Sequence, residues 1–185
     1  MKTLALWIFI LGFATSALAL DEFPLSPWLT YGIESRWEKT STQDIVGRNL
    51  NPFAVGASWG HFILYYEYGS FTDLTGNTAL SVNRKFVNHL LAVNYRNDDW
   101  GFSEYFIPYL GMGLGTQKET LDTTLLAQTT TDTSRDYLLS EFHTGVQWNY
   151  TKLLWFSLEA RLLFGEKTEP NPQVSVLGRL GFWIR

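Results

Sequence analysis

Apolar and polar residues alternate along most of this chain with a period of two, the pattern of β-strands that have one apolar and one polar face. Each alternating stretch ends in a turn or in a polar loop. The pattern predicts eight strands, which are Trp28–Lys39, Pro52–Trp59, Phe62–Thr72, Lys85–Arg96, Phe106–Gln117, Tyr137–Tyr150, Leu153–Phe164 and Val174–Ile184. After residue 19 no apolar run comes close to the roughly 18 residues that predict a transmembrane helix.

The connections between the predicted strands alternate between short and long. The short ones are Gly60–His61, Asn97–Ser103 and Asn149–Lys152. The long ones are Thr40–Asn51, Asp73–Arg84, Lys118–Asp136 and Gly165–Gln173. Short periplasmic turns and longer external loops are typical of outer-membrane barrels, so we expect an all-β fold, an eight-stranded antiparallel up-and-down transmembrane β-barrel. Both termini should then lie in the periplasm, and the Thr-rich segment Lys118–Asp136 should be a mobile external loop.

The two faces of each predicted strand differ in polarity. In the seventh predicted strand, Leu158 and Leu162 share one face, whereas Glu159 and Arg161 share the other. The charged residues and the histidine assigned to the polar faces are Glu34, Arg36, Glu67, Arg96, Glu141, His143, Glu159, Arg161 and Arg179. A soluble barrel with these charges inside would leave its apolar faces in water, so we expect the apolar faces to contact lipid and the polar faces to line the lumen.

The N-terminal segment has the features of a cleavable export signal. Lys2 provides a short positive region, Leu4–Phe13 is an apolar run, and Ala17-Leu18-Ala19 fits the cleavage pattern. The apolar run is too short to span a bilayer as a helix. We therefore expect residues 1–19 to be a signal peptide and residues 20–185 to form the barrel domain.

The composition agrees with an exported membrane barrel. Cleavage of the leader removes one of the 14 basic residues and none of the 18 acidic ones, which leaves a net charge of about −5 and no basic patch suited to nucleic acid. The chain has no cysteine, so disulfides cannot stabilise it, whereas the closed hydrogen-bond ladder of a barrel can.

Aromatic residues make up 16% of the chain, including eight tryptophans, which suits two aromatic belts at the membrane interfaces. The predicted periplasmic belt is Trp28, Trp59, Phe62, Trp100, Trp148, Trp155 and Phe182. The predicted external belt is Trp37, Phe53, Phe71, Phe86, Tyr137 and Phe164.

The fifth predicted strand has two unusual features. Pro108 cannot donate to a hydrogen-bond ladder, which predicts a bulge or an unpaired end there. Gly111, Gly113 and Gly115 all point inward in the predicted register, and should leave room for bulky neighbours.

The chain ends in the strand VSVLGRLGFWIR, with Phe182 and Ile184 on its apolar face. Together with the signal, the eight segments and the loop alternation, this makes the mature chain resemble the small outer-membrane barrel family that includes the OmpA transmembrane domain and OmpX. In that family the last strand ends in an aromatic residue and serves as the assembly signal, whereas this chain ends in Arg185. The resemblance implies a bacterial outer-membrane location, with outer-membrane lipid, periplasmic chaperones and the assembly machinery as partners.

The inward charges predict an ion-pair network. A short turn near Asn149–Lys152 would place Glu141 opposite Arg161 and His143 opposite Glu159, and Arg179 could lie beside Glu159. Such charges could form the gate or selectivity element of a pore. They could instead fill the lumen, which we favour because an eight-stranded barrel is only just wide enough for side chains.

Enzymatic chemistry is not expected. Glu141, His143 and Ser157 have the side chains of a hydrolase triad, but an enzyme acting on lipid A needs these groups on its lipid face, whereas here Glu141 and His143 point to the lumen. The histidines, His61, His89 and His143, are too widely separated to predict a metal site, and no cofactor is expected. We therefore expect a structural or surface-interaction role, with a narrow pore and a lipid A-modifying enzyme as alternatives. The sequence does not identify a ligand of the external loops.

Overall fold

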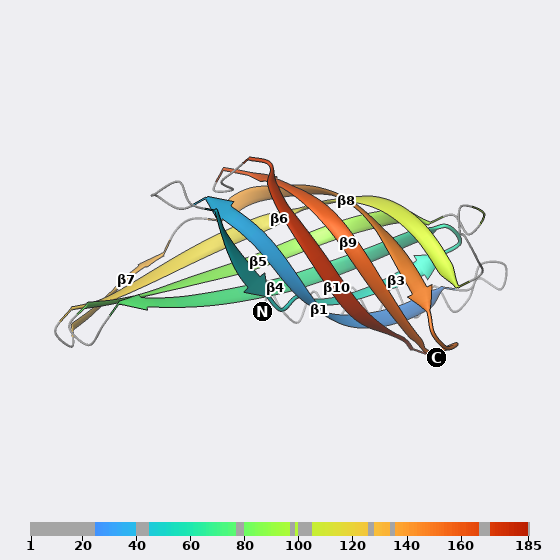
Figure 1. Ribbon diagram of the computed structural model, residues 1–185, viewed down its shortest axis with the longest axis horizontal. Coiled ribbons are helices and arrows are strands. Elements are labelled where there is room, and N and C mark those ends of the chain that lie inside the picture. Colours follow the sequence, from blue (N-terminus) through green and yellow to red (C-terminus); the bar gives the residue numbers. More distant parts are fainter. Residues whose placement is uncertain are drawn as a thin grey trace.

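The computed structural model describes residues 25–39, 45–76, 80–96, 99, 105–125, 128–133, 136–166 and 171–184. These residues form the strands β1 (Ser26–Lys39), β2 (Ile45–Leu50), β3 (Phe53–Trp59), β4 (Phe62–Gly76), β5 (Leu80–Arg96), β6 (Phe106–Leu125), β7 (Gln128–Thr133), β8 (Tyr137–Asn149), β9 (Leu154–Gly165) and β10 (Gln173–Trp183) (Figure 1). The described part of the chain contains no helix that is long and apolar enough to cross a bilayer. The predicted leader, residues 1–19, lies outside the described residues.

Eight of the strands close into an antiparallel barrel. Its seam is formed by β1 and β10, which pair from Trp28 opposite Trp183 to Arg36 opposite Ser175. The rest of the wall is β3, β4, β5, β6, β8 and β9, paired in chain order. Because the wall closes on itself, each strand has a hydrogen-bonded neighbour on both sides, which satisfies the backbone without water. The predicted eight-stranded antiparallel barrel is confirmed.

Strands β4, β5 and β6 continue past the rim of the barrel and, together with β7, form the tapering extension at the left of Figure 1. We call this extension the distal sheet and define it as residues 69–76, 80–87, 118–125 and 128–133. The pairing of β3 with β4 ends at Tyr68, and that of β8 with β6 ends at Gln117. Strands β5 and β6 stay paired as far as Leu80 opposite Leu125.

The distal sheet corrects the predicted loops. Most of Asp73–Arg84 and Lys118–Asp136 is strand, and β2 occupies much of the predicted loop Thr40–Asn51. Threonine-on-threonine pairs join β6 to β7 at Thr120 and Thr133, Thr123 and Thr130, and Thr124 and Thr129. Threonine favours strands because of its branched side chain, and cross-strand threonine pairs stabilise a sheet. A polar, Thr-rich segment that continues an existing ladder can therefore form a sheet rather than a loop.

The faces of the barrel strands follow the predicted alternation. In β9, Leu158 is 62% exposed and Leu162 is 42% exposed on the outside. Glu159 and Arg161, at 2% and 1%, are buried in the lumen. The predicted assignment of apolar side chains to the outer surface and charged side chains to the interior is therefore confirmed for this strand.

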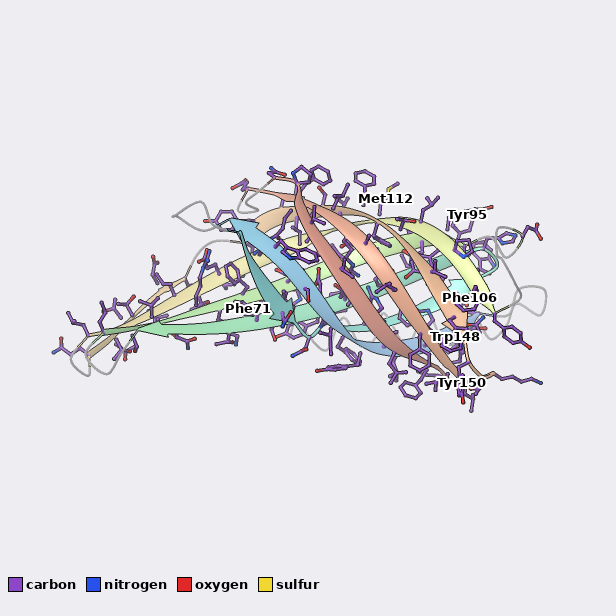
Figure 2. All side chains as sticks on the ribbon, in the orientation of Figure 1. Phe71, Tyr95, Phe106, Met112, Trp148 and Tyr150 are labelled. Carbon is purple, nitrogen blue, oxygen red and sulfur yellow. The ribbon has the colours of Figure 1, made fainter. Side chains whose placement is uncertain are left out.

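Aromatic side chains gather on the outer surface at the short-turn end of the barrel, the end that carries the turn Gly60–His61. Figure 2 shows Phe106, Trp148 and Tyr150 at this end. The rings of Phe106 and Trp148 stack with centroids 5.6 Å apart, and Trp148 lies against Tyr150 at 6.1 Å. These rings form part of an aromatic belt around one rim.

Three residues assigned to the aromatic belts are buried instead, and a fourth, Phe71, shares the face of its cross-strand partner Phe86. Trp28 and Trp155 are buried in the lumen, and Phe86 is buried against Phe71 at the opposite end, with ring centroids 6.2 Å apart. The belt assignment used only the distance of each residue from a strand end and ignored which face it occupied. Trp100 lies outside the described residues.

Two local features fit their residues. Gly60 adopts a φ of 56° in the turn between β3 and β4, a conformation that glycine reaches without steric cost. Pro108 pairs in register with Val146 of β8, so the bulge that was one predicted outcome does not form. On the other side of β6, the pairing with β5 ends at Tyr109, which leaves Pro108 at an unpaired end, the other predicted outcome.

Candidate functional site

The centre of the lumen holds a network of buried ion pairs, which we call the central network: Glu67, Glu141, Glu159, Arg161 and Arg179. Arg161 of β9 donates from both terminal nitrogens to the two oxygens of Glu67, at 2.8 and 2.9 Å. It also donates to Glu159 at 3.0 Å and lies 3.3 Å from Glu141. This bidentate, multiply paired arrangement matches the planar guanidinium.

Arg179 of β10 ties the same carboxylates together from the other side. Its Nε donates to Glu159 at 2.6 Å, and its Nη2 donates to Glu67 at 2.5 Å. The guanidinium also lies over the ring of Tyr65, 5.0 Å from the centroid. Glu67 and Glu159 each accept from both arginines, so β4 is linked to β9 and β10 across the lumen.

His143 of β8 extends the central network toward β5. Its Nδ1 lies 3.0 Å from Glu141 Oε1, and its Nε2 lies 2.5 Å from Asn94 Oδ1. Gly111 faces these groups, and a Cβ there would overlap both the imidazole and the Asn94 amide. The prediction that the inward glycines leave room for bulky neighbours is therefore confirmed at this position.

A second, smaller cluster lies nearer the distal sheet. Arg36 donates from Nε and Nη2 to the two oxygens of Glu34, both at 3.0 Å. Ser175 donates to Glu34 at 2.7 Å, and this joins β10 to β1 inside the seam. With the Asn88 amide flipped, the orientation that satisfies its neighbours, its oxygen accepts from Arg36 at 2.7 and 2.9 Å. Glu34 and Arg36 are thus paired with one another rather than with the central network.

Aromatic side chains fill the lumen at the short-turn end. The Trp28 ring lies 5.6 Å from both Trp155 and Tyr65, and Trp183 packs against the same cluster. Gly181 faces Trp155 so closely that a Cβ would overlap the indole. Strand β10 can approach this cluster only because it has no side chain there.

The cross-strand pairing of β8 with β9 differs from the prediction by two residues. His143 lies opposite Arg161, and Glu141 lies opposite Leu163. The connection between the two strands is longer than the predicted turn, because the last paired residues are Asn149 and Trp155. A shift of two residues keeps every side chain on its predicted face, so Glu141 still reaches Arg161 diagonally.

The nine predicted lumen residues therefore lie at three levels. Six of them come together in the centre: Glu67, Glu141, His143, Glu159, Arg161 and Arg179. Glu34 and Arg36 form the second cluster. Arg96 is half-buried at the short-turn end of β5, opposite Tyr109 of β6. Asn88 and Asn94 also lie in the lumen and were not predicted there, although their alternation with Leu90 and Ala92 places them on the inner face.

The comparisons with known proteins concern the fold. No protein-family model matches the chain, and no curated protein sequence matches it. The solved structure of Neisserial surface protein A (NspA) superposes with a TM-score of 0.65 at 13% identity, covering 87% of this chain and 98% of that one. Ail, the attachment invasion locus protein of Yersinia pestis in complex with the heparin analogue sucrose octasulfate, gives 0.57 at 11% identity, covering 86% and 96%. The N-terminal β-barrel domain of Pseudomonas aeruginosa OprF gives 0.52 at 13% identity, covering 88% and 100%.

The fold is that of the small outer-membrane barrels. In a small outer-membrane barrel of eight strands, the lumen has little more than the width that side chains occupy. Here the aromatic cluster, the central network and the Glu34–Arg36 cluster fill successive levels of it. A cavity of about 10 Å³ remains beside Trp28, Trp155 and Glu159, which is room for about one water molecule.

The barrel keeps Ser157 away from the other two suspected hydrolase residues, His143 and Glu141. Ser157 lies opposite Gln147, four residues along β8 from His143, which is a separation of about 13 Å at the usual strand rise. Within the described ranges, no group of three or more His, Cys, Asp or Glu side chains could hold a metal ion.

Proposed function

We propose that the chain is a surface protein of a bacterial outer membrane, in which the barrel serves as the anchor and the distal sheet as the interaction surface. The observation that carries the proposal is the distal sheet itself, which projects from one end of a barrel whose lumen is filled with paired side chains. Two structural neighbours are named as a surface protein and an attachment protein, which supports the same class of role here.

The position in the membrane follows from the outer surface. Leu91, Met112, Leu114 and Leu158 are each more than half exposed on the barrel wall, and in lipid these side chains would no longer contact water. The short-turn end would then face the periplasm, and the distal sheet would extend into the medium. Periplasmic chaperones and the outer-membrane assembly machinery would be its partners during insertion.

Cysteine labelling tests this topology, because the chain has no cysteine of its own. Thr130→Cys places a thiol on the fully exposed strand β7, and Lys152→Cys places one on the exposed turn after β8. A maleimide polymer too large for outer-membrane pores should label Thr130→Cys on intact cells and Lys152→Cys only after permeabilisation. Labelling in the reverse order would contradict the topology, and no labelling of Thr130→Cys on intact cells would contradict surface display.

The filled lumen favours an anchor over a pore. We propose that the barrel does not conduct ions and has no catalytic activity. Planar-bilayer recordings of the refolded protein should show no stepwise conductance, because the central network and the aromatic cluster occupy the path. Mass spectrometry of lipid A from cells that overproduce the protein should show an unmodified species.

A further inference from the structure

Two lysines lie on the outer surface where the barrel passes into the distal sheet. Lys85 of β5 pairs with Thr120 of β6, and Lys118 of β6 pairs with Val87 of β5. The lysines are therefore diagonal neighbours on adjacent strands, with Cα atoms about 7–8 Å apart in ordinary sheet geometry. Both side chains are exposed. Their flexible stems are long enough for both ammonium groups to reach a single anion.

The surroundings of the two lysines contain few opposite charges in the part of the chain that the structure describes. Among the described residues, no ion pair reaches Lys85 or Lys118. The nearby ion pair of Arg84 with Glu119 lies on the opposite face of the sheet, because alternate residues of a strand point to opposite sides. Asp122, which shares the outer face, accepts a hydrogen bond from Thr131 at 2.7 Å. The outer face thus carries two adjacent positive charges, and the carboxylate of Asp122 is the other diagonal neighbour of Lys85.

Below the lysines, the surface changes from polar to aromatic to apolar. His89 points outward, with its Nδ1 2.5 Å from the Tyr66 hydroxyl and its ring 5.5 Å from that of Tyr68. Further along the same wall, Leu91 and Leu114 are 57% and 62% exposed. Tyrosine and histidine therefore lie between the lysines and the exposed leucines. This order is expected at the boundary between the hydrocarbon core and the headgroup region of a membrane.

The height of the lysines agrees with that boundary. From Tyr95, at the short-turn end in Figure 2, to Lys85 the strand runs ten residues. Ten residues at about 3.3 Å each, tilted by about 40°, rise about 25 Å, the height of the lipid-facing band of an outer-membrane barrel. The two ammonium groups therefore lie at the headgroup level on the side of the distal sheet.

We propose that Lys85, Lys118 and His89 bind a phosphate group of an anionic lipid in the outer leaflet; this rests on the proposed outer-membrane location. Two lysines supply the charge, since an ammonium group is a compact phosphate binder. Thr72, opposite Lys85, and Thr116, opposite His89, add exposed hydroxyl donors. The acyl chains of the same lipid would lie along the apolar wall below, so headgroup and chains meet matching surfaces.

Lipid A is a suitable probe because it carries two phosphates. The protein, refolded in detergent micelles, is titrated with lipid A, and the bound fraction is measured by native mass spectrometry. The double variant Lys85→Gln/Lys118→Gln should bind about thirtyfold more weakly than the wild type, because each lysine near a headgroup contributes a factor of about five. Lys85→Arg/Lys118→Arg should keep most of the affinity. Lys152→Gln, an exposed lysine at the other end of the barrel, should bind like the wild type.

Two further ligands separate the sources of phosphate. Dephosphorylated lipid A should bind all variants equally weakly, and inorganic phosphate at millimolar concentration should not displace lipid A. Three results would each overturn the site. The first is that the wild type and Lys85→Gln/Lys118→Gln bind lipid A equally well. The others are that Lys152→Gln loses as much affinity as the double variant, or that free phosphate displaces lipid A.

Insertion into phosphatidylcholine liposomes is measured in parallel. Failure of the wild type to insert would overturn the proposed function and this site with it. Normal insertion with unchanged lipid A binding in the double variant would overturn the site alone.

Discussion

Arg161 is the residue on which the lumen depends most. Its side chain is 1% exposed, and it contacts three carboxylates, of Glu67, Glu141 and Glu159. A guanidinium taken out of water loses its hydration, and only several well-placed acceptors can offset that loss. The reverse also holds, because carboxylates in a dry interior need the cation. Neither side of the network is stable without the other.

Arg161→Ala should therefore lower the free energy of unfolding by about 3–5 kcal/mol, because it leaves buried carboxylates without their main partner. Urea unfolding of the refolded protein, followed by tryptophan fluorescence, measures the loss. Arg84→Ala is the matched control, since Arg84 pairs with Glu119 at 2.5 Å but is partly exposed, and its loss should not exceed about 1 kcal/mol. A loss of about 1 kcal/mol for Arg161→Ala as well would indicate a wet lumen and favour the pore.

At the scale of the strand, the sequence predicts faces better than partners. The assignment of Glu159 and Arg161 to the lumen depends only on local alternation, which any register keeps. The pairing of β8 with β9 depends on the length of the turn, so that prediction was wrong by two residues. Trp28 shares a face with Thr30, so its inward position could have been read from the same alternation. The distal sheet could not be read this way, because its Thr-rich strands lack an apolar face.

Strand β9 offers a direct check of the faces. Leu158→Arg puts a charge on the outer wall at mid-strand and should cost about 2–4 kcal/mol in a bilayer, whereas Ser157→Ala, on the lumen side, should cost far less. Unfolding of both variants in liposomes provides the comparison. If Ser157→Ala proved the more damaging of the two, the assignment of the outer wall to lipid would be wrong.

The whole molecule combines a rigid, filled barrel with a sheet that continues beyond it. The barrel wall is closed by the pairing of β1 with β10, and its lumen is crossed by ion pairs. The distal sheet does not close on itself, and strand β7 is exposed along its full length. The barrel portions of these strands thus contribute most of the stability, and their extensions in the distal sheet provide the exposed surface.

The closed ladder should make the protein resist detergent. Refolded and unboiled, it should migrate on a cold SDS gel at a different position from the boiled form, because the intact barrel excludes detergent from its backbone. The boiled sample is its own control. Identical migration of the two forms, for material with the circular dichroism of a β-sheet protein, would contradict a closed barrel.

Glu67 is 94 residues before Arg161 and 112 before Arg179 in the chain, yet it binds both. These partners lie on β4, β9 and β10, so they face one another across the interior only after the last strand has returned to the first. A half-assembled sheet, still open at the seam, would leave Glu67 without either arginine and would expose the charges of its inner face to lipid. Pairing of β1 with β10 and pairing of the charges in the lumen are therefore one cooperative event. Assembly intermediates in which the barrel is still open are disfavoured, because their charges contact lipid.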